Sequence, residues 1–119
     1  METLATALKG LTEPIRLRIL NLLRNRELCV CDLMEVLEIP QSTISRHLSY
    51  LRKAGWIESR KGGKWTYHRR SEKPTPLLVS VFAALDTAFA QKPIAQEDNE
   101  RLARWLETKD EHHCNDTQE

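Results

Sequence analysis

The 119-residue sequence is poor in several residue types whose abundance would define its class. It has only three cysteines and four glycines, and aromatic residues make up 6% of it. Three cysteines are too few for a disulfide framework, so we expect free thiols or metal ligands. No apolar run approaches the length that spans a bilayer. The length fits one domain, and a domain this small often gains stability by forming oligomers.

The N-terminus also lacks a secretory signal. Residues 1–8 contain neither the basic region nor the apolar stretch of such a signal. We therefore expect a cytoplasmic protein without a membrane partner, in a compartment that keeps thiols reduced.

A formal net charge of +1 hides a strong asymmetry along the chain. Residues 41–70 carry eight basic side chains against one acid, Glu58, for a net charge of +7. Residues 95–119 carry three basic and eight acidic side chains, for a net charge of −5. A concentrated basic block is typical of a nucleic-acid contact, because phosphate neutralisation supplies much of the affinity.

Helical periodicity dominates the first forty residues. Leucines recur at helical spacing in residues 4–11. Thr12 is expected to cap a second helix with Glu13 and Pro14 in its first turn. A third helix is predicted from about Val30 to Leu37.

A fourth helix, from about Gln41 to Ala54, has two distinct faces. It follows a break at Ile39-Pro40 and is closed by Gly55. At about 100° per residue, an apolar stripe and a polar face lie on opposite sides. The stripe is formed by Ile44, Leu48 and Leu51, and the polar face by Ser42, Thr43, Arg46, Ser49, Tyr50 and Lys53. The polar face is rich in hydrogen-bond donors and holds no acid.

The next segment predicts a β-hairpin. Residues 56–61 and 64–68 have strand character and flank Gly62-Gly63, a pair suited to a two-residue turn. An apolar helix follows at Leu77–Phe89, and then a weaker helix. Residues 109–119 have the polar composition of a disordered tail.

Two short helices joined by a tight break, the second with a polar outer face, are typical of a helix-turn-helix. The basic hairpin that follows makes it the winged variant. The predicted fold class is therefore mainly α with a small β-hairpin, a winged helix-turn-helix in the order α-α-α-α-β-β-α. Its second helix would enter the major groove with its N-terminal residues nearest the bases.

The candidate DNA contacts lie in that second helix and in the hairpin. Arg46 is the best base reader, because its guanidinium can pair bidentately with guanine. Lys61 and Lys64 suit backbone phosphate or the minor groove. Structural roles stay open: Ser42 can cap the helix, and His47 can pack at the core's edge. The candidates are Gln41, Ser42, Thr43, Ser45, Arg46, His47, Lys61 and Lys64.

The segment Cys29-Val30-Cys31 is a candidate site for a soft ion. Thiolates select thiophilic ions over oxygen-seeking ones. Cys29 stands where Ser or Thr would cap the third helix, with Asp32 at the position of a capping-box acid. Because a helix N-terminus favours negative charge, we expect a lowered pKa for both thiols.

Regular structure keeps these two sulfurs apart. Side chains at i and i+2 point about 200° apart on a helix and to opposite faces of a strand. Chelation by Cys29 and Cys31 therefore predicts unwinding of the third helix's first turn. Because that helix packs against the recognition helix, we hypothesise that a bound ion disfavours the DNA-competent form.

Four stretches of the chain also carry a family pattern, namely EPIRLRIL (residues 13–20), ELCVCDL (27–33), QSTISRHL (41–48) and LRKAGWI (51–57). In unbroken order, they resemble the ArsR/SmtB family of metalloregulatory repressors. The resemblance implies a symmetric homodimer that represses transcription and leaves its operator DNA when an inducer binds. It places the first helix and the helix at Leu77–Phe89 at the subunit interface, where the latter's apolar stripe suits a two-fold contact. We therefore divide the chain into a winged-helix DNA-binding and dimerisation domain, residues 1–92, and a C-terminal helical extension and tail, residues 93–119.

The resemblance also implies an inducer. In that family the ELCVCDL pattern is associated with As(III) and Sb(III), which makes the chain a repressor of an arsenic-resistance operon with no obligatory cofactor. The best-known members have a further cysteine where this chain has Met34, a weak ligand that we assign to the core. The third coordination position is left to Cys114, an external thiol or water.

Other functions are alternatives. Cadmium, lead or zinc sensors of this family recruit N-terminal cysteines, which this chain lacks before Cys29, or use Asp and His on the dimer helix, where only Asp86 is present. A repressor that senses thiol oxidation also stays open. An enzyme with a small-molecule substrate is disfavoured, because Cys-x-Cys occurs without a βαβ pattern or a convincing base. The polar face of the fourth helix makes DNA a better partner than an acidic protein.

Overall fold

The computed structural model describes residues 1–109; residues 110–119, which include Cys114 and nearly all of the predicted tail, lie outside the described residues. The fold is mainly α with a small β-sheet, as predicted. Its elements are α1 (Glu2–Lys9), α2 (Pro14–Leu22), β1 (Leu28–Cys29), α3 (Val30–Leu37), α4 (Gln41–Lys53), β2 (Ile57–Gly62), β3 (Trp65–Arg70), α5 (Pro76–Phe89) and α6 (Pro93–Thr108).

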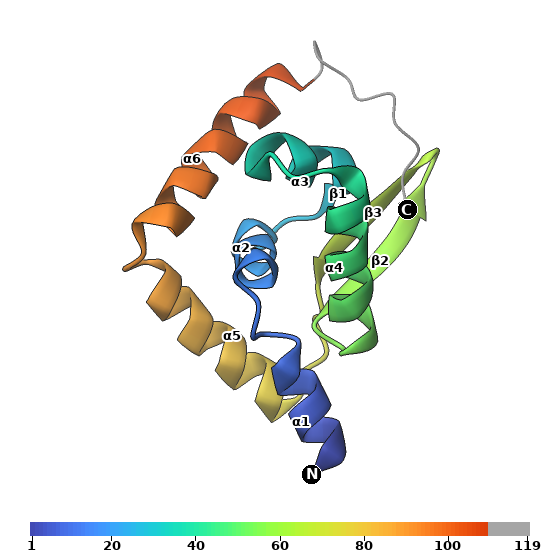
Figure 1. Cartoon of the computed structure of the whole chain (residues 1–119), viewed down its shortest axis with the longest axis vertical. Helices are drawn as coiled ribbons and strands as arrows, with labels where there is room; N and C mark the ends of the chain where they lie inside the picture. The colour runs from blue at the N-terminus through green and yellow to red at the C-terminus, as the bar shows by residue number, and fades with distance from the viewer. Residues whose placement is uncertain (110–119) are drawn as a thin grey trace.

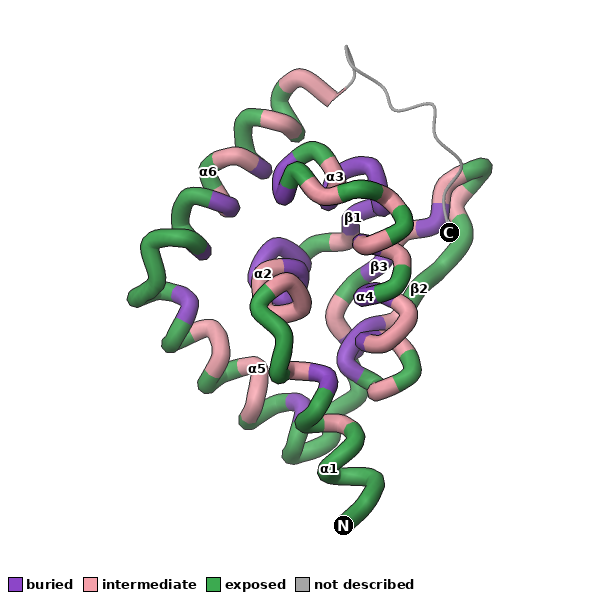
Figure 2. Tube along the Cα trace, in the orientation of Figure 1, coloured by how far each residue is buried: buried purple, intermediate pink, exposed green. Residues whose placement is uncertain are grey.

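Helix α2 lies at the centre of the molecule (Figure 1). Helices α3 and α4 and the sheet lie on one side of it, and α5 and α6 form an arc on the other. Buried apolar residues of α2, α3 and α4 make up most of the core. Figure 2 colours these and all other buried residues purple along the Cα trace. From α6, Leu102 joins this core with no exposed surface. The division of the chain at residue 92 stays a prediction.

The two faces of α4 are arranged as its sequence predicts. Ile44, Leu48 and Leu51 are fully buried, whereas Ser42 and Arg46 are exposed. The apolar stripe therefore fixes which side of α4 is presented to solvent.

The sheet is three-stranded and antiparallel, in the order β1-β3-β2. The two-residue strand β1, which was not predicted, pairs Cys29 with Tyr67 of β3. The hairpin turn is also one residue later than predicted. Gly62 still pairs with Trp65, so Gly63 and Lys64 form the loop, and Gly63 adopts the left-handed φ of +66°.

Helix α2 begins one residue later than a cap at Thr12 would predict. Thr12 does not cap it, because its hydroxyl donates instead to the carbonyl oxygen of Lys9 at 2.7 Å. The N-cap is Glu13, which is extended and makes no side-chain cap. Pro14, at the first helical position, accounts for this shift, because proline forces its predecessor out of helical geometry.

Trp56 connects the base of the hairpin to two helices. Its side chain is 1% exposed, and its indole Nε1 donates to the carbonyl oxygen of Ala7 in α1 at 2.6 Å. Its ring also packs edge-on against Phe82 of α5, with centroids 5.7 Å apart. Trp56 thus ties α1 and α5 to the point where the chain leaves α4.

Helices α1 and α5 expose apolar side chains. Leu8 in α1 is 41% exposed and Val79 in α5 is 60% exposed, and α1 has no buried residue. Among the described residues no single helix is long and apolar enough to cross a membrane. Helices α5 and α6 reach that length and apolar content only when taken together, and they are bent by 93° relative to each other.

Candidate nucleic-acid interface and thiol site

The first turn of α4 forms a helix N-terminus without a side-chain cap. Its N-cap is Pro40, no side-chain cap is present, and the N–H groups of Thr43 and Ile44 donate to the Pro40 carbonyl oxygen. The predicted alternative that Ser42 caps the helix therefore does not hold, since Ser42 is inside the helix and exposed. The first turn contains no acid, whereas the last contains Arg52 and Lys53. A helix N-terminus with no acid in its first turn suits a phosphate oxygen, because the helix dipole favours negative charge there.

Most of the predicted DNA contacts reach the surface. Exposed ones are Ser42, Arg46, Lys61 and Lys64, and half-buried ones are Gln41, Thr43 and Ser45. The lysines lie on the hairpin, Lys61 in β2 and Lys64 in the turn, away from the α4 stripe.

His47 packs at the edge of the core, which is the structural alternative to its predicted DNA contact. It is only 7% exposed, and its Nδ1 accepts a hydrogen bond from Arg16 Nε at 3.1 Å. Burial, followed by the nearby Arg16 and Arg46, lowers the pKa of His47. A neutral imidazole in this position supports α4 from inside and has little surface for DNA.

Arg16 is a supporting residue that the sequence pattern did not reveal. Besides its bond to His47, its guanidinium lies 3.8 Å from the centre of the Tyr50 ring. Both contacts join α2 to the inner edge of α4. The only signal in the sequence is an arginine within an amphipathic helix, which does not identify a partner 31 residues away.

Acidic partners neutralise part of the basic block. Arg60 pairs with Glu27, and its guanidinium lies over the Tyr67 ring at 4.9 Å. Arg69 pairs with Glu58 at 3.3 Å. Exposed positive charge on the polar face of α4 and on the hairpin is carried by Arg46, Lys53, Lys61 and Lys64.

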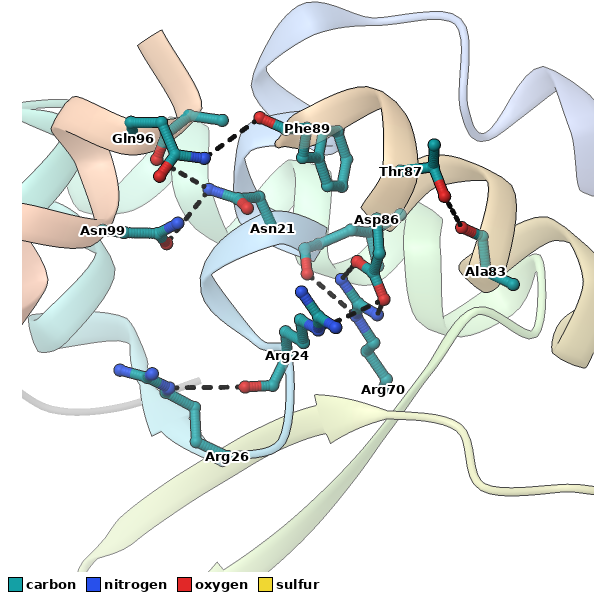
Figure 3. Close-up of polar contacts among 12 residues, drawn as sticks. Asn21, Arg24, Arg26, Arg70, Ala83, Asp86, Thr87, Phe89, Gln96 and Asn99 are labelled. Carbon is teal, nitrogen blue, oxygen red and sulfur yellow. Dashed lines mark hydrogen bonds and ion pairs between the residues drawn. The ribbon is translucent and has the colours of Figure 1, made fainter. Parts of the chain in front are cut away.

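Arg70 pairs with Asp86 of α5 in a bidentate contact, at 2.8 and 3.0 Å. Arg24 approaches the same carboxylate at 3.4 Å, and Figure 3 shows both guanidinium groups on it. Arg70 also donates to the carbonyl oxygen of Leu20. The Asp86 carboxylate therefore connects α5 to β3 through Arg70, and to the residues just after α2 through Arg24.

The thiol segment lies at the junction of β1 and α3. Cys29 and Cys31 are 3% and 6% exposed. Cys29 is the N-cap of α3, and the predicted capping box with Asp32 is present. The backbone N–H of Cys29 donates to Asp32 Oδ2 at 2.9 Å, and its Sγ lies 3.3 Å from the same oxygen.

The pKa of Cys29 moves in the direction opposite to the prediction. Burial, and then the negative charge of Asp32, raise it, and the weaker effect of Lys109 does not reverse the shift. The prediction for Cys29 was wrong because it considered the helix N-terminus alone. The capping carboxylate, in hydrogen-bond contact with the sulfur, disfavours a second negative charge.

Helix α6 completes the surroundings of Asp32. Trp105 Nε1 donates to Asp32 Oδ1 at 2.8 Å, and Lys109 Nζ lies 2.9 Å from Oδ1 and 3.1 Å from Oδ2. Asp32 itself has no exposed surface. Met34 is half-buried against the core, in agreement with its prediction. Within residues 1–109 no three His, Cys, Asp or Glu side chains form a ready metal cluster.

Fold and site together define a winged helix-turn-helix protein. A family model described as "Bacterial regulatory protein, arsR family" matches residues 13–59. A helix-turn-helix transcriptional regulator of Methanocaldococcus jannaschii is 44% identical over 68 residues, which are 56% of this chain and 76% of the relative. The chain belongs to the arsR family of DNA-binding transcriptional repressors, which are not enzymes.

Relatives with named resistance functions match a shorter part. The arsenical resistance operon repressor of Escherichia coli is 48% identical over 64 residues, 53% of this chain and 55% of the relative. A cadmium resistance regulator of Listeria innocua is 39% identical over 61 residues, 50% of this chain and 51% of the relative. The chain thus spans about half the length of these two regulators.

Solved structures show the same fold. The transcriptional repressor BigR from Xylella fastidiosa superposes with a TM-score of 0.64 at 31% identity, over 76% of this chain and 86% of BigR. A homodimeric winged helix-turn-helix domain from Mycobacterium bovis gives a TM-score of 0.64 at 25% identity, over 77% of this chain and 82% of that domain.

Proposed function

We propose that this protein represses an arsenic-resistance operon and leaves its operator DNA when As(III) or Sb(III) binds Cys29 and Cys31. The observation that carries the proposal is the position of both cysteines at the start of α3, the helix that packs on α4. The named arsenical repressor among its relatives supports the choice of ion.

The DNA-binding half of the proposal rests on α4 and the hairpin. The N-terminus of α4, which contains no acid, binds phosphate while Arg46 reads a guanine edge. Lys61 and Lys64 hold the flanking backbone. The half-buried Gln41, Thr43 and Ser45 complete the contact with the exposed Ser42, and His47 acts from inside by fixing the helix.

A homodimer would present two copies of this surface to one operator. The exposed apolar side chains of α1 and α5 suit the buried centre of a two-fold interface. The homodimeric relative supports the same assembly. Two recognition helices about 34 Å apart would then meet successive turns of the major groove, in the cytoplasm, where the operator lies.

The chemistry of the inducer fits a buried thiol whose pKa is raised, as that of Cys29 is. When As(OH)₃ reacts with two thiols, two S–As bonds form, two As–OH bonds break, and the thiol protons leave within two water molecules. No net proton is released, so a raised pKa at Cys29 does not oppose the reaction. The remaining hydroxide is retained or replaced by Cys114 or an external thiol.

Cadmium sensing is the second candidate, because a cadmium resistance regulator is among the relatives. Binding of Cd²⁺ to two thiols releases two protons, so the raised pKa of Cys29 lowers its affinity at neutral pH. The surroundings of Cys29 therefore favour arsenite over cadmium.

The test is DNA binding by the reduced full chain, followed by fluorescence anisotropy. An operator duplex selected from a random library is titrated with protein, and then separately with arsenite, antimonite, cadmium and zinc. We expect release by arsenite and antimonite, and loss of that release in Cys29→Ser and Cys31→Ser with operator affinity retained. Undiminished arsenite release in either variant, or a response to zinc alone, would overturn the inducer assignment. Cys114→Ser shows whether the tail thiol adds to it.

A further inference from the structure

Asp32 joins the thiol segment to the far end of the chain. Its Oδ2 contacts both the backbone N–H and the sulfur of Cys29, and its two oxygens contact Trp105 and Lys109. One fully buried carboxylate thus holds the first turn of α3 and the last turn of α6 together.

The rest of α6 is fastened independently of Asp32. Arg18 of α2 makes a bidentate ion pair with Asp98, at 2.8 and 2.9 Å, and Asp98 has no exposed surface. Leu102 is fully buried one helical turn further along. Asn21 also donates to the carbonyl oxygen of Ala95. The first three turns of α6 are therefore anchored to the core, whereas its C-terminal end is held beside α3 by Asp32.

We propose that the C-terminal turn of α6 is a latch over the thiol segment, and that ion binding at Cys29 and Cys31 releases it through Asp32. The inference rests on the proposed function, because it requires an ion at these thiols. For both sulfurs to hold one ion, Cys29 turns away from Asp32 or the first turn of α3 unwinds. Either movement breaks the contact between the sulfur and Oδ2, and unwinding of the turn also moves the Asp32 carboxylate away from Trp105 Nε1.

Linkage makes this proposal quantitative. If ion binding weakens the latch, then weakening the latch must increase affinity for the ion by the same factor. Trp105 and Lys109 are thus positioning residues that hold the site closed. If these two residues only stabilised the site, their substitution would instead lower the affinity for the ion, because a damaged site binds its ion less well.

Trp105→Phe is the decisive variant, since it removes the indole N–H donor and retains an aromatic ring. The matched control is Arg101→Gln, which breaks the ion pair between α6 and Glu38 at the other end of α3. Affinity for arsenite is measured on the reduced full chain by isothermal titration calorimetry. We expect Trp105→Phe to bind arsenite about fivefold or more tightly than wild type, and Arg101→Gln to match wild type.

Amide hydrogen exchange gives a second readout. In wild type, arsenite should accelerate exchange in the C-terminal turn of α6, up to Lys109, and leave the segment around Asp98 unchanged. Weaker or unchanged arsenite affinity in Trp105→Phe, or unchanged exchange in that turn with arsenite bound, would refute the latch while leaving the proposed function intact.

Cadmium separates the two proposals. Faster exchange at the end of α6 with cadmium, in a protein that does not bind arsenite, would support the latch and overturn the arsenic assignment. Binding of neither ion would overturn both proposals.

Discussion

The first turns of α3 and α4 belong to neighbouring helices but differ in nearly every physical respect. The first turn of α3 is buried and capped, and it contains the acid Asp32 in contact with Cys29. The first turn of α4 follows Pro40, has no side-chain cap and no acid, and exposes Ser42. A ligand of α3 must therefore displace existing contacts, whereas DNA bound at α4, as proposed, would not have to displace a capping side chain. This difference suits a pair of helices in which, as proposed, α3 binds the inducer and α4 binds DNA.

The largest expected effect comes from removing the acid of the α3 turn. Asp32→Ala leaves the Lys109 ammonium, the Trp105 N–H and the Cys29 N–H without their shared acceptor. We expect the free energy of unfolding to fall by about 3 kcal/mol. Urea unfolding at a fixed protein concentration measures it. Asp32→Asn, which retains one acceptor oxygen, should lose less, and equal losses for both variants would contradict this account.

The next effect concerns the polar face of α4. Arg46→Ala should weaken operator binding by about 1–3 kcal/mol and relax sequence preference at one base pair. Anisotropy on an operator and on variants substituted at single positions measures both quantities. Arg104→Ala, an exposed arginine on α6, is the charge-matched control and should bind as wild type does. Uniform weakening on every sequence would show that Arg46 contacts phosphate rather than a base.

A smaller effect is expected at the hairpin. Lys61→Gln and Lys64→Gln should each lower the slope of log affinity against log salt concentration by about 1, with sequence preference unchanged. Binding titrations at several salt concentrations measure the slope, and Lys92→Gln, outside the proposed interface, serves as control. Slopes identical to wild type would remove the hairpin from the interface.

The smallest expected effect is a pH dependence of folding stability that comes from His47, on the buried side of α4. Because the pKa of His47 is lowered in the folded protein, the unfolded chain binds a proton more readily near its ordinary value of 6.5. Folding stability should therefore fall as pH drops through that value. Urea midpoints of wild type and His47→Gln at about pH 7.5 and about pH 5.5 give the comparison. A pH dependence that is as steep in the variant would assign the effect to other groups.

The faces of α4 and the capping role of Cys29 could be predicted from sequence because both depend on local spacing. Ile44, Leu48 and Leu51 repeat at helical intervals, and Cys29 stands three residues before Asp32. Strand β1 could not be predicted, because two residues carry no periodicity. The contact of Asp32 with Trp105 could not be predicted for another reason, because it joins residues that are 73 positions apart in the sequence.

The direction of the Cys29 pKa shows a different limit of sequence reasoning. A helix N-terminus is visible in the sequence, and by itself it lowers the pKa of a thiol. Burial depends on how α6 and the sheet cover the site, and it acts in the other direction. Local patterns therefore identified the cysteines as the candidate site but not the direction in which the pKa of Cys29 is shifted.

In the proposed dimer, Trp56 would affect which spacing of operator half-sites the protein accepts. In a dimer built on α1 and α5, this one side chain would connect the subunit interface to the end of each recognition helix. Its rigid side chain would then fix the distance between the two recognition helices. Insertion of one base pair between half-sites should penalise the wild-type dimer heavily, while a shorter side chain at this position would let the same protein accept both spacings.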